Sequence, residues 1–161
     1  MTPGCSMLST DAESMPSKPD YAPRDACWRE DAEALAAIRR RVFIEEQGVP
    51  EALEWDGLDE HARHVLAETP DGRAIGCARL LDDGHIGRMA VLPEWRGLGV
   101  GGVLLRRLLE RAAEAGLPRC WLDAQTHATG FYRRFGFHEE GEEFLDAGIP
   151  HRRMRHDPTR S

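Results

Sequence analysis

The sequence predicts one domain of the α+β or α/β class, built around a mixed sheet. Three observations lead to this prediction. Apolar residues recur at helical spacing after Asp31, short strands separated by turns follow from His64, and a glycine-rich loop opens an amphipathic helix near Val100. With 161 residues, the chain is long enough to bury a single core of ordinary size.

The first part of the chain changes character once. Residues 1–25 are rich in Ser, Pro, Asp and Thr and poor in large apolar groups, so we expect a disordered or loosely held tail there. The domain is predicted over residues 26–161 and opens with a short strand near residues 27–29. The first helix is indicated by the apolar positions Ala34, Leu35, Ile38 and Val42. It should end near residues 47–48, before Pro50.

A β-meander is predicted in the middle of the chain. Strands are expected over residues 64–68, 74–81 and 85–92, because each run is bounded by turn residues. In the first turn, residues 69–72, Pro fixes φ and Gly supplies a positive φ. Residues 82–84 form the second hairpin turn.

After the meander, helix and strand patterns alternate. The helix that follows the glycine loop carries one apolar face, made of Leu104, Leu105, Leu108 and Ala112. Gly116 and Pro118 stop this helix. The remaining predicted elements are a strand over residues 120–124, a short helix over 129–135, a strand from 137 and a last strand over 152–156.

Composition and charge exclude several classes of protein. The formal net charge of -7 argues against general nucleic-acid binding, which depends on many Lys and Arg side chains at phosphates. No run of about 18 apolar residues is present, so no membrane segment is predicted. The N-terminus does not resemble a secretory signal. The four cysteines are far apart and contain no C-x-x-C pair, which indicates a reducing, cytoplasmic location.

The glycine loop over residues 96–102 carries the functional argument. Glycines let the backbone approach a ligand closely, and the following helix supplies unpaired N–H groups and a positive dipole end. Together they predict an anion site of the size of a pyrophosphate, with Arg96 adding a formal charge.

A nicotinamide-dependent oxidoreductase is a rival interpretation of the same loop. Gly97, Gly99 and Gly102 fit G-x-G-x-x-G, and Asp123 lies roughly where a ribose-binding carboxylate is expected. Residues 93–96, however, separate the first glycine from the preceding strand, and the loop follows a meander. Too little chain remains for a doubly wound sheet. No G-K-[ST] follows, which excludes a Walker A loop.

Three segments resemble the GNAT family of N-acetyltransferases. Residues 96–101 match the [RQ]-x-x-G-x-[GA] motif, residues 86–93 look like the family's central strand, and residues 128–137 look like its Phe-Tyr pair before Gly-Phe. The resemblance covers roughly Cys27 to His156.

Three further segments are similar to the ElaA/YjcF-like branch of this family. They are residues 42–50, 78–81 and 148–151.

The resemblance implies a GNAT-like α+β fold in three layers, with a split, mixed and mostly antiparallel sheet flanked by helices. It implies acetyl-CoA as the acyl-donor cosubstrate and a primary amine of a small molecule or peptide as the acceptor. A homodimer is also an expectation of the family. The cofactor-binding residues that it implies are Met89, Ala90, Val91, Arg96, Gly97, Leu98, Gly99, Val100, Gly101 and Gly102. A non-catalytic acyl-CoA-binding module stays open as an alternative.

Direct transfer needs a base for the amine and a proton for the leaving thiolate. The resemblance assigns the proton donor to Tyr132, although this ring is also suited to packing beside Phe131 and Phe135. The base stays open among Glu45, Glu46, Asp123 and His151. The predicted acceptor-side residues are Glu45, Gln47 and His151. An acidic surface favours a cationic acceptor by steering.

Other groupings of reactive residues in the sequence give only weak indications of a site. His61 and His64 form H-x-x-H near Asp56, Asp59 and Glu60, but the spacing matches no defined metal motif, and we predict no metal. No Ser-His-Asp or Cys-His arrangement is readable. Cys120 lies in an apolar strand and is expected in the core.

Overall fold

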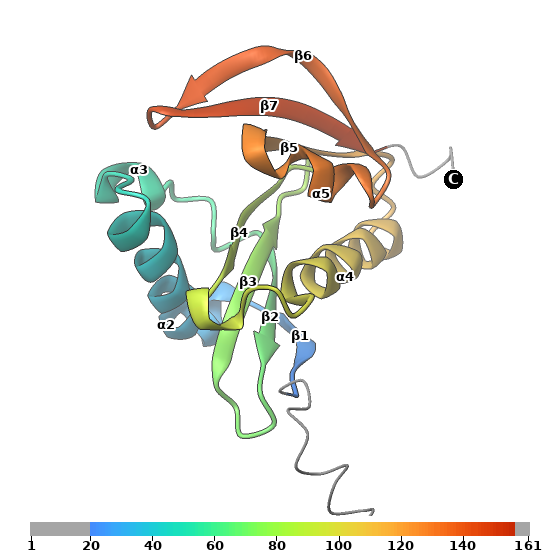
Figure 1. The fold of residues 1–161 in the computed structure, drawn as a ribbon. Coiled ribbons are helices and arrows are strands. Elements are labelled where there is room, and N and C mark those ends of the chain that lie inside the picture. Colours follow the sequence, from blue (N-terminus) through green and yellow to red (C-terminus); the bar gives the residue numbers. More distant parts are fainter. Residues whose placement is uncertain (1–19, 157–161) are drawn as a thin grey trace, which may run out of the picture.

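A computed structural model of the protein describes residues 20–156, which form two β-sheets with helices packed against the first (Figure 1). The first sheet is antiparallel, in the order β1 (Ala22–Ala26), β2 (Arg63–Glu68), β3 (Ala74–Leu80) and β4 (Ile86–Val91). The second sheet is also antiparallel, in the order β5 (Cys120–Gln125), β7 (Ile149–His156) and β6 (Phe137–Asp146). The expected split, mostly antiparallel arrangement is therefore present, and the bridge between His85 and Trp121 is its parallel contact.

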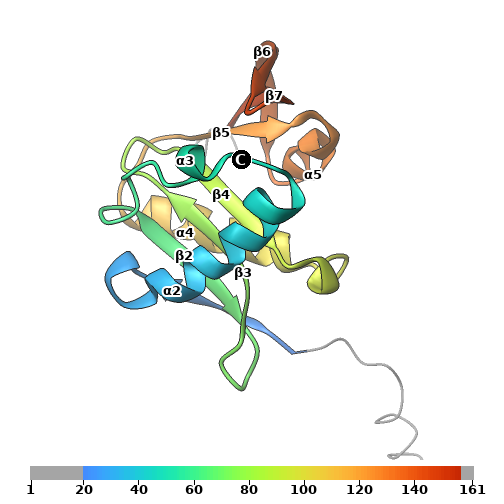
Figure 2. The same cartoon turned by 90° about the vertical axis from the view of Figure 1, so that its left-hand side faces the viewer.

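The helices cover both faces of the first sheet. Helix α2 (Trp28–Arg39) and helix α4 (Val100–Glu114) lie on opposite sides of it, which gives the three predicted layers (Figures 1 and 2). The other helical elements are the π-helical turn η1 (Arg40–Glu46), α3 (Glu51–Glu54), η2 (Pro93–Trp95), η3 (Thr126–Ala128) and α5 (Thr129–Arg133). No helix in the described residues is long and apolar enough to cross a membrane.

The core lies between the two long helices and the first sheet. Leu35 and Ile38 of α2 are buried on one face, and the predicted apolar face of α4 is buried on the other. Burial of one Leu or Ile side chain contributes about 1.5–3 kcal/mol, so these two faces hold α2 and α4 in place.

In the described residues, one backbone bridge connects the two sheets. His85, just before β4, forms a parallel bridge with Trp121 of β5, and the Trp121 amide donates to the Gly84 carbonyl at 3.0 Å. Gly84 has a φ of 89°, and a Cβ atom there would lie 2.1 Å from the Arg119 oxygen, so only glycine fits. Among the described residues no further backbone bridge joins β4 to β5, so the sheet is split beyond this bridge.

Two predictions at the N-terminus are wrong. All of strand β1 except Ala26 lies within the segment expected as a tail, and the strand predicted over residues 27–29 is absent because α2 begins at Trp28. β1 is an edge strand with only Ala26 buried, so it lacks the alternation that marks a strand. Ion pairs from Arg24 to Asp31 and Glu68 fix it instead. Residues 1–19 lie outside the described part of the chain.

Candidate active site between the two sheets

Two adjoining cavities open where β4 and β5 separate. The first, of about 300 Å³, is lined by Tyr132 and is called the tyrosine cavity. The second, of about 650 Å³, is lined by Arg96 beside the glycine loop and is called the loop cavity. Both cavities are lined by Gln47, Met89, Gln125, Ala128 and Ile149. They are therefore two ends of one opening.

A pair of glutamines spans this opening. The Gln125 Nε2 atom of β5 donates to the Gln47 Oε1 atom at 3.0 Å. Gln47 follows the π-helical turn η1, in which the Gln47 amide bonds back five residues to the Val42 carbonyl. The turn thus brings Gln47, a predicted acceptor-side residue, to the boundary between the cavities.

Strand β4 contains a bulge at the site. Cys77 pairs with Ala90 and Arg79 pairs with Gly87, so β4 has one residue more than β3 over this stretch. Arg88 in the bulge has a φ of 51°. Because a bulge interrupts the ladder and re-aims side chains, it accounts for Met89 facing both cavities.

The glycine loop opens α4 as an anion site would require. Gly99 caps the helix in the left-handed region, and the first helical bond runs from the Val103 amide to the Gly99 carbonyl at 3.1 Å. The N–H groups of residues 100–102 therefore have no acceptor within the helix. The Tyr21 hydroxyl donates to the Leu98 carbonyl at 2.7 Å and fixes the loop.

The glycines of this loop have two different roles. Gly97 and Gly99 have positive φ, as a tight approach to α4 needs. A Cβ atom on Gly102 would lie 2.9 Å from the Phe135 ring, and one on Gly101 would lie 3.4 Å from the Phe131 ring. The second pair therefore lets the aromatic segment around α5 pack against α4, a role that the sequence does not predict.

Arg96 lines the loop cavity with its charge already engaged. Its guanidinium forms a two-pronged ion pair with Glu46 at 2.7 and 2.8 Å, and its Nε atom donates to the Val91 carbonyl at 3.0 Å. The hydrogen bond from Arg96 lowers the pKa of Glu46, which favours the carboxylate. Glu46, considered as a base, is thus ion-paired on the loop side. Glu45 is exposed and lines neither cavity, so the structure does not bring it to the site.

Tyr132 is half-buried and faces the tyrosine cavity. Its hydroxyl donates to the Met89 sulfur, a weak acceptor, at 3.7 Å. Burial raises the pKa of Tyr132 to about 12, so the phenol keeps its proton at neutral pH. Its ring also makes edge contacts with Phe131 and Phe137, so it packs and lines the cavity at once.

His151 in β7 lines the same cavity with only 9% of its surface exposed. Its Nδ1 atom lies 2.7 Å from the Ile149 carbonyl oxygen. Because a carbonyl only accepts, Nδ1 carries a proton, and in the neutral ring Nε2 is the free acceptor. Asp123 also lines the cavity, but Arg153 holds its carboxylate at 2.8 Å.

His85 is a cavity residue that sequence reasoning missed. Its ring stacks on Trp121 at 3.9 Å between centroids, and burial lowers the pKa of this histidine. The Arg153 guanidinium also packs against Trp121, 4.2 Å from the ring centroid. The local sequence signal that could have indicated this residue is that a histidine directly follows the turn before β4.

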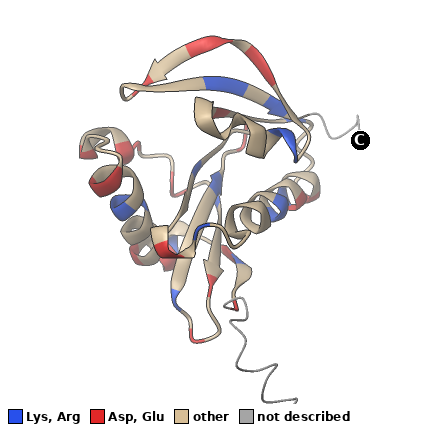
Figure 3. Cartoon of the chain, viewed as in Figure 1, with Lys and Arg blue, Asp and Glu red and all other residues tan. Residues whose placement is uncertain are grey.

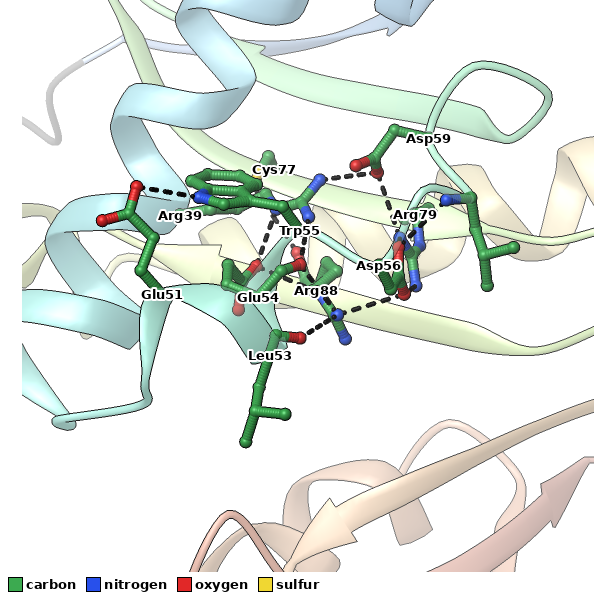
Figure 4. Close-up of polar contacts among 11 residues, drawn as sticks. Arg39, Glu51, Leu53, Glu54, Trp55, Asp56, Asp59, Cys77, Arg79 and Arg88 are labelled. Carbon is green, nitrogen blue, oxygen red and sulfur yellow. Dashed lines mark hydrogen bonds and ion pairs between the residues drawn. The ribbon is translucent and has the colours of Figure 1, made fainter.

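A cluster of charged side chains, drawn in Figure 4, reaches the tyrosine cavity through Glu54 and Arg88. It joins three arginines to three carboxylates: Arg39, Arg79, Arg88, Glu54, Asp56 and Asp59. Arg39 contacts Glu54 at 2.8 Å and Asp59 at 2.7 Å. Burial raises the pKa of Asp56, but hydrogen bonds from Arg79 and a backbone amide outweigh this and lower it to about 2.

Two of the carboxylates near the H-x-x-H pair, Asp56 and Asp59, belong to this cluster. Asp56 and Asp59 pair with arginines, while the His64 ring contacts the Asp59 backbone carbonyl at 3.0 Å and His61 is exposed. Across residues 20–156 no group of three or more candidate ligand side chains is close enough to hold a metal ion.

The split sheet, the bulged β4 and the open turn of α4 define an acyltransferase of the acyl-CoA-dependent class. Residues 18–158 match the family model described as the acetyltransferase (GNAT) domain, and the chain belongs to this family. The predicted fold class and family are confirmed. The dinucleotide-binding interpretation of the glycine loop is wrong, because in this fold the loop follows a meander rather than the first strand of a βαβ unit.

Individual relatives place the chain near the predicted branch. It is 40% identical over 125 residues to an uncharacterized N-acetyltransferase, YjcF of Bacillus subtilis. The matched residues cover 74% of this chain and 88% of that protein. The crystal structure of Escherichia coli ElaA has a TM-score of 0.76 and 30% identity, covering 86% of this chain and all of that one. An acyl-CoA N-acyltransferase from Pseudomonas aeruginosa has a TM-score of 0.74 and 32% identity, with 85% and 99% covered.

Proposed function

We propose that this protein transfers an acetyl group from acetyl-CoA directly to a primary amine. The observation that carries the proposal is the shared cavity of Tyr132 and His151, which adjoins the loop cavity through Gln47 and Gln125 and so leads to Arg96, at the start of the glycine loop. A proton donor and a proton acceptor thus face one space, next to a place for an acyl donor.

The loop cavity would hold the acyl donor. The free N–H groups of residues 100–102 would donate hydrogen bonds to the pyrophosphate, helped by the positive end of the α4 dipole. By the family resemblance, backbone groups of Met89 and Val91 would pair with the pantetheine arm. Both residues line this cavity, beside the β4 bulge. The thioester would then reach the boundary at Met89.

The tyrosine cavity would hold the acceptor. The amine nitrogen attacks the thioester carbonyl carbon, so a C–N bond forms and the C–S bond breaks. The His151 Nε2 atom takes the proton that leaves the nitrogen, and the Tyr132 hydroxyl gives its proton to the departing sulfur. Solvent then restores both groups. Burial raises the pKa of Tyr132, so the hydroxyl is protonated and available when the C–S bond breaks, and the same apolar surroundings disfavour a free thiolate.

Replacement of Tyr132 tests the proton donor. Tyr132→Phe keeps the ring that packs on Phe131 and Phe137 and removes only the hydroxyl. We expect turnover to fall about 10²- to 10⁴-fold, the usual contribution of a general acid. The dissociation constant of acetyl-CoA, measured by calorimetry, should stay the same. Equal turnover in the two proteins would contradict the role of Tyr132.

A further inference from the structure

We propose that the acceptor is a small alkyl diamine: an aliphatic primary amine with a second ammonium group and no carboxylate. Its reacting nitrogen would lie at His151, and its distal ammonium would bind Asp146. This inference rests on the proposed function and names the substrate class of the same site.

The tyrosine cavity is acidic. Its walls carry three carboxylates, from Glu54, Asp123 and Asp146, and one guanidinium, from Arg88. Arg88 is already engaged, since its Nη2 atom lies 3.1 Å from an Asp56 oxygen and its Nε atom lies 3.0 Å from a Glu54 oxygen. Glu54 is also paired with Arg39, and Asp123 is paired with Arg153, so the uncompensated negative charge at this cavity is that of Asp146, which favours a cationic guest.

Among residues 20–156, no wall residue of this cavity offers a free cation to a substrate carboxylate. Arg153, which pairs with Asp123, packs on Trp121 and does not line the cavity. An amino acid bound here would place its carboxylate near like charges without a partner, which is costly in a partly dry site. The cavity thus disfavours acceptors that carry a carboxylate beside the amine.

Asp146 is the carboxylate of this cavity that is available to bind a cation. It ends β6 at the mouth of the cavity and has no ion pair or hydrogen bond among the described residues. On the same strand, Glu139 pairs with Arg133 and Glu140 pairs with Arg155. The acidic stretches of β6 and the basic ones of β7 are visible in Figure 3. Glu142 and Glu143 of β6 also have no ion pair among the described residues, but they do not line the cavity, so Asp146 is the unpaired carboxylate of this strand that faces it.

Two further features point to a guest that has an alkyl chain. His151 is more than nine-tenths buried, and its Nε2 atom has no partner among the described contacts, so a buried acceptor faces the cavity. Apolar side chains form much of the remaining wall: Phe43, Val49, Leu53, Ile86, Leu122 and Ile149. The methylene chain of a short diamine would pack against these groups while its two nitrogens bind His151 and Asp146.

A matched set of acceptors tests the inference with the full-length protein and acetyl-CoA. The set is 1,4-diaminobutane, n-butylamine, which lacks the distal ammonium, and ornithine, which adds a carboxylate. We expect kcat/KM for the diamine to exceed that for butylamine by about 5-fold, the upper range for an exposed ion pair. It should exceed that for ornithine by about 10-fold or more. Ornithine equal to the diamine would overturn the inference.

Asp146→Asn should bring the diamine-to-butylamine ratio close to one. Glu143→Gln is the control, because this exposed carboxylate of β6 does not line the cavity and the ratio should stay as in the wild type. An unchanged ratio in Asp146→Asn overturns the inference. Acetylation of butylamine without any diamine preference overturns it while leaving the proposed function intact. If acetyl-CoA binds and no amine is acetylated, the proposed function fails as well.

Discussion

The two histidines of the tyrosine cavity differ in how they are held. The Nδ1 atom of His151 is fixed by the Ile149 carbonyl, which orients its Nε2 atom. The ring of His85 is fixed by stacking on Trp121, and its nitrogens have no hydrogen bond among the described residues. A general base needs a defined orientation toward its substrate, so the hydrogen-bonded residue is better suited to the role.

A pH–rate profile separates the two histidines. His151→Ala should lower kcat/KM about 100-fold and remove the limb of the profile that reports the general base. His85→Ala is the matched control and should keep that limb. A limb that persists in His151→Ala and disappears in His85→Ala would assign the base to His85 instead.

At the scale of single elements, α4 and the segment around α5 depend on each other. Phe135 fills the space left by the missing Cβ atom of Gly102, and Phe131 does the same at Gly101. The same segment carries Tyr132, so this packing positions the proposed proton donor beside the first turn of α4.

Two glycine-to-alanine changes test this packing. In Gly102→Ala, the new Cβ atom would lie 2.9 Å from Phe135, and we expect a loss of about 1–3 kcal/mol in the free energy of unfolding. In Gly130→Ala, within α5, nothing lies within 4 Å, so a gain of about 0.4–1 kcal/mol is expected. Urea unfolding measures both. Equal effects of the two changes would show that contact with Phe135 is unimportant.

Elements with a local pattern could be predicted from the sequence, and those with distant partners could not. The meander and the apolar face of α4 follow from spacing within a few residues, and both are present. β1 depends on partners far along the chain, such as the ion pair of Asp25 with Arg107, 82 residues away. The pairing of Arg39 with Asp59 and the stacking of His85 are likewise products of tertiary structure. No spacing rule reveals them.

At the scale of the whole molecule, the charge cluster ties four elements together. Arg39 comes from α2, Glu54 from α3, Arg79 from β3 and Arg88 from the β4 bulge. Breaking such a buried network leaves charges without partners, which costs more than the network gains when intact. The cluster therefore supports the wall of the tyrosine cavity.

Asp59→Asn tests the contribution of the cluster. This carboxylate is buried and contacts both Arg39 and Arg79, so we expect a loss of about 3–5 kcal/mol in the free energy of unfolding. Asp82→Asn removes an exposed pair with Arg63 and should cost about 1 kcal/mol or less. Similar losses in the two variants would contradict a structural role for the cluster.

Acid unfolding gives a second test of the same cluster. Asp56 has a pKa lowered from 3.8 to about 2, so its carboxylate stabilises the folded state above pH 3.8. That stability should be lost as pH falls from about 4 to 2, because the unfolded state takes up the proton first. In Asp56→Asn the pH dependence over this window should be shallower. An identical dependence in both proteins would contradict the lowered pKa.

The most direct test of the central claim follows an isotope-labelled acetyl group from acetyl-CoA in the presence of an alkyl amine. Mass spectrometry of the products and of the intact protein would be combined with an assay of the free CoA thiol. We predict equal amounts of CoA and N-acetylated amine, with no label on the protein. Release of CoA without acetylated amine, or an acetyl group bound to the protein as an intermediate, would contradict direct transfer to an amine.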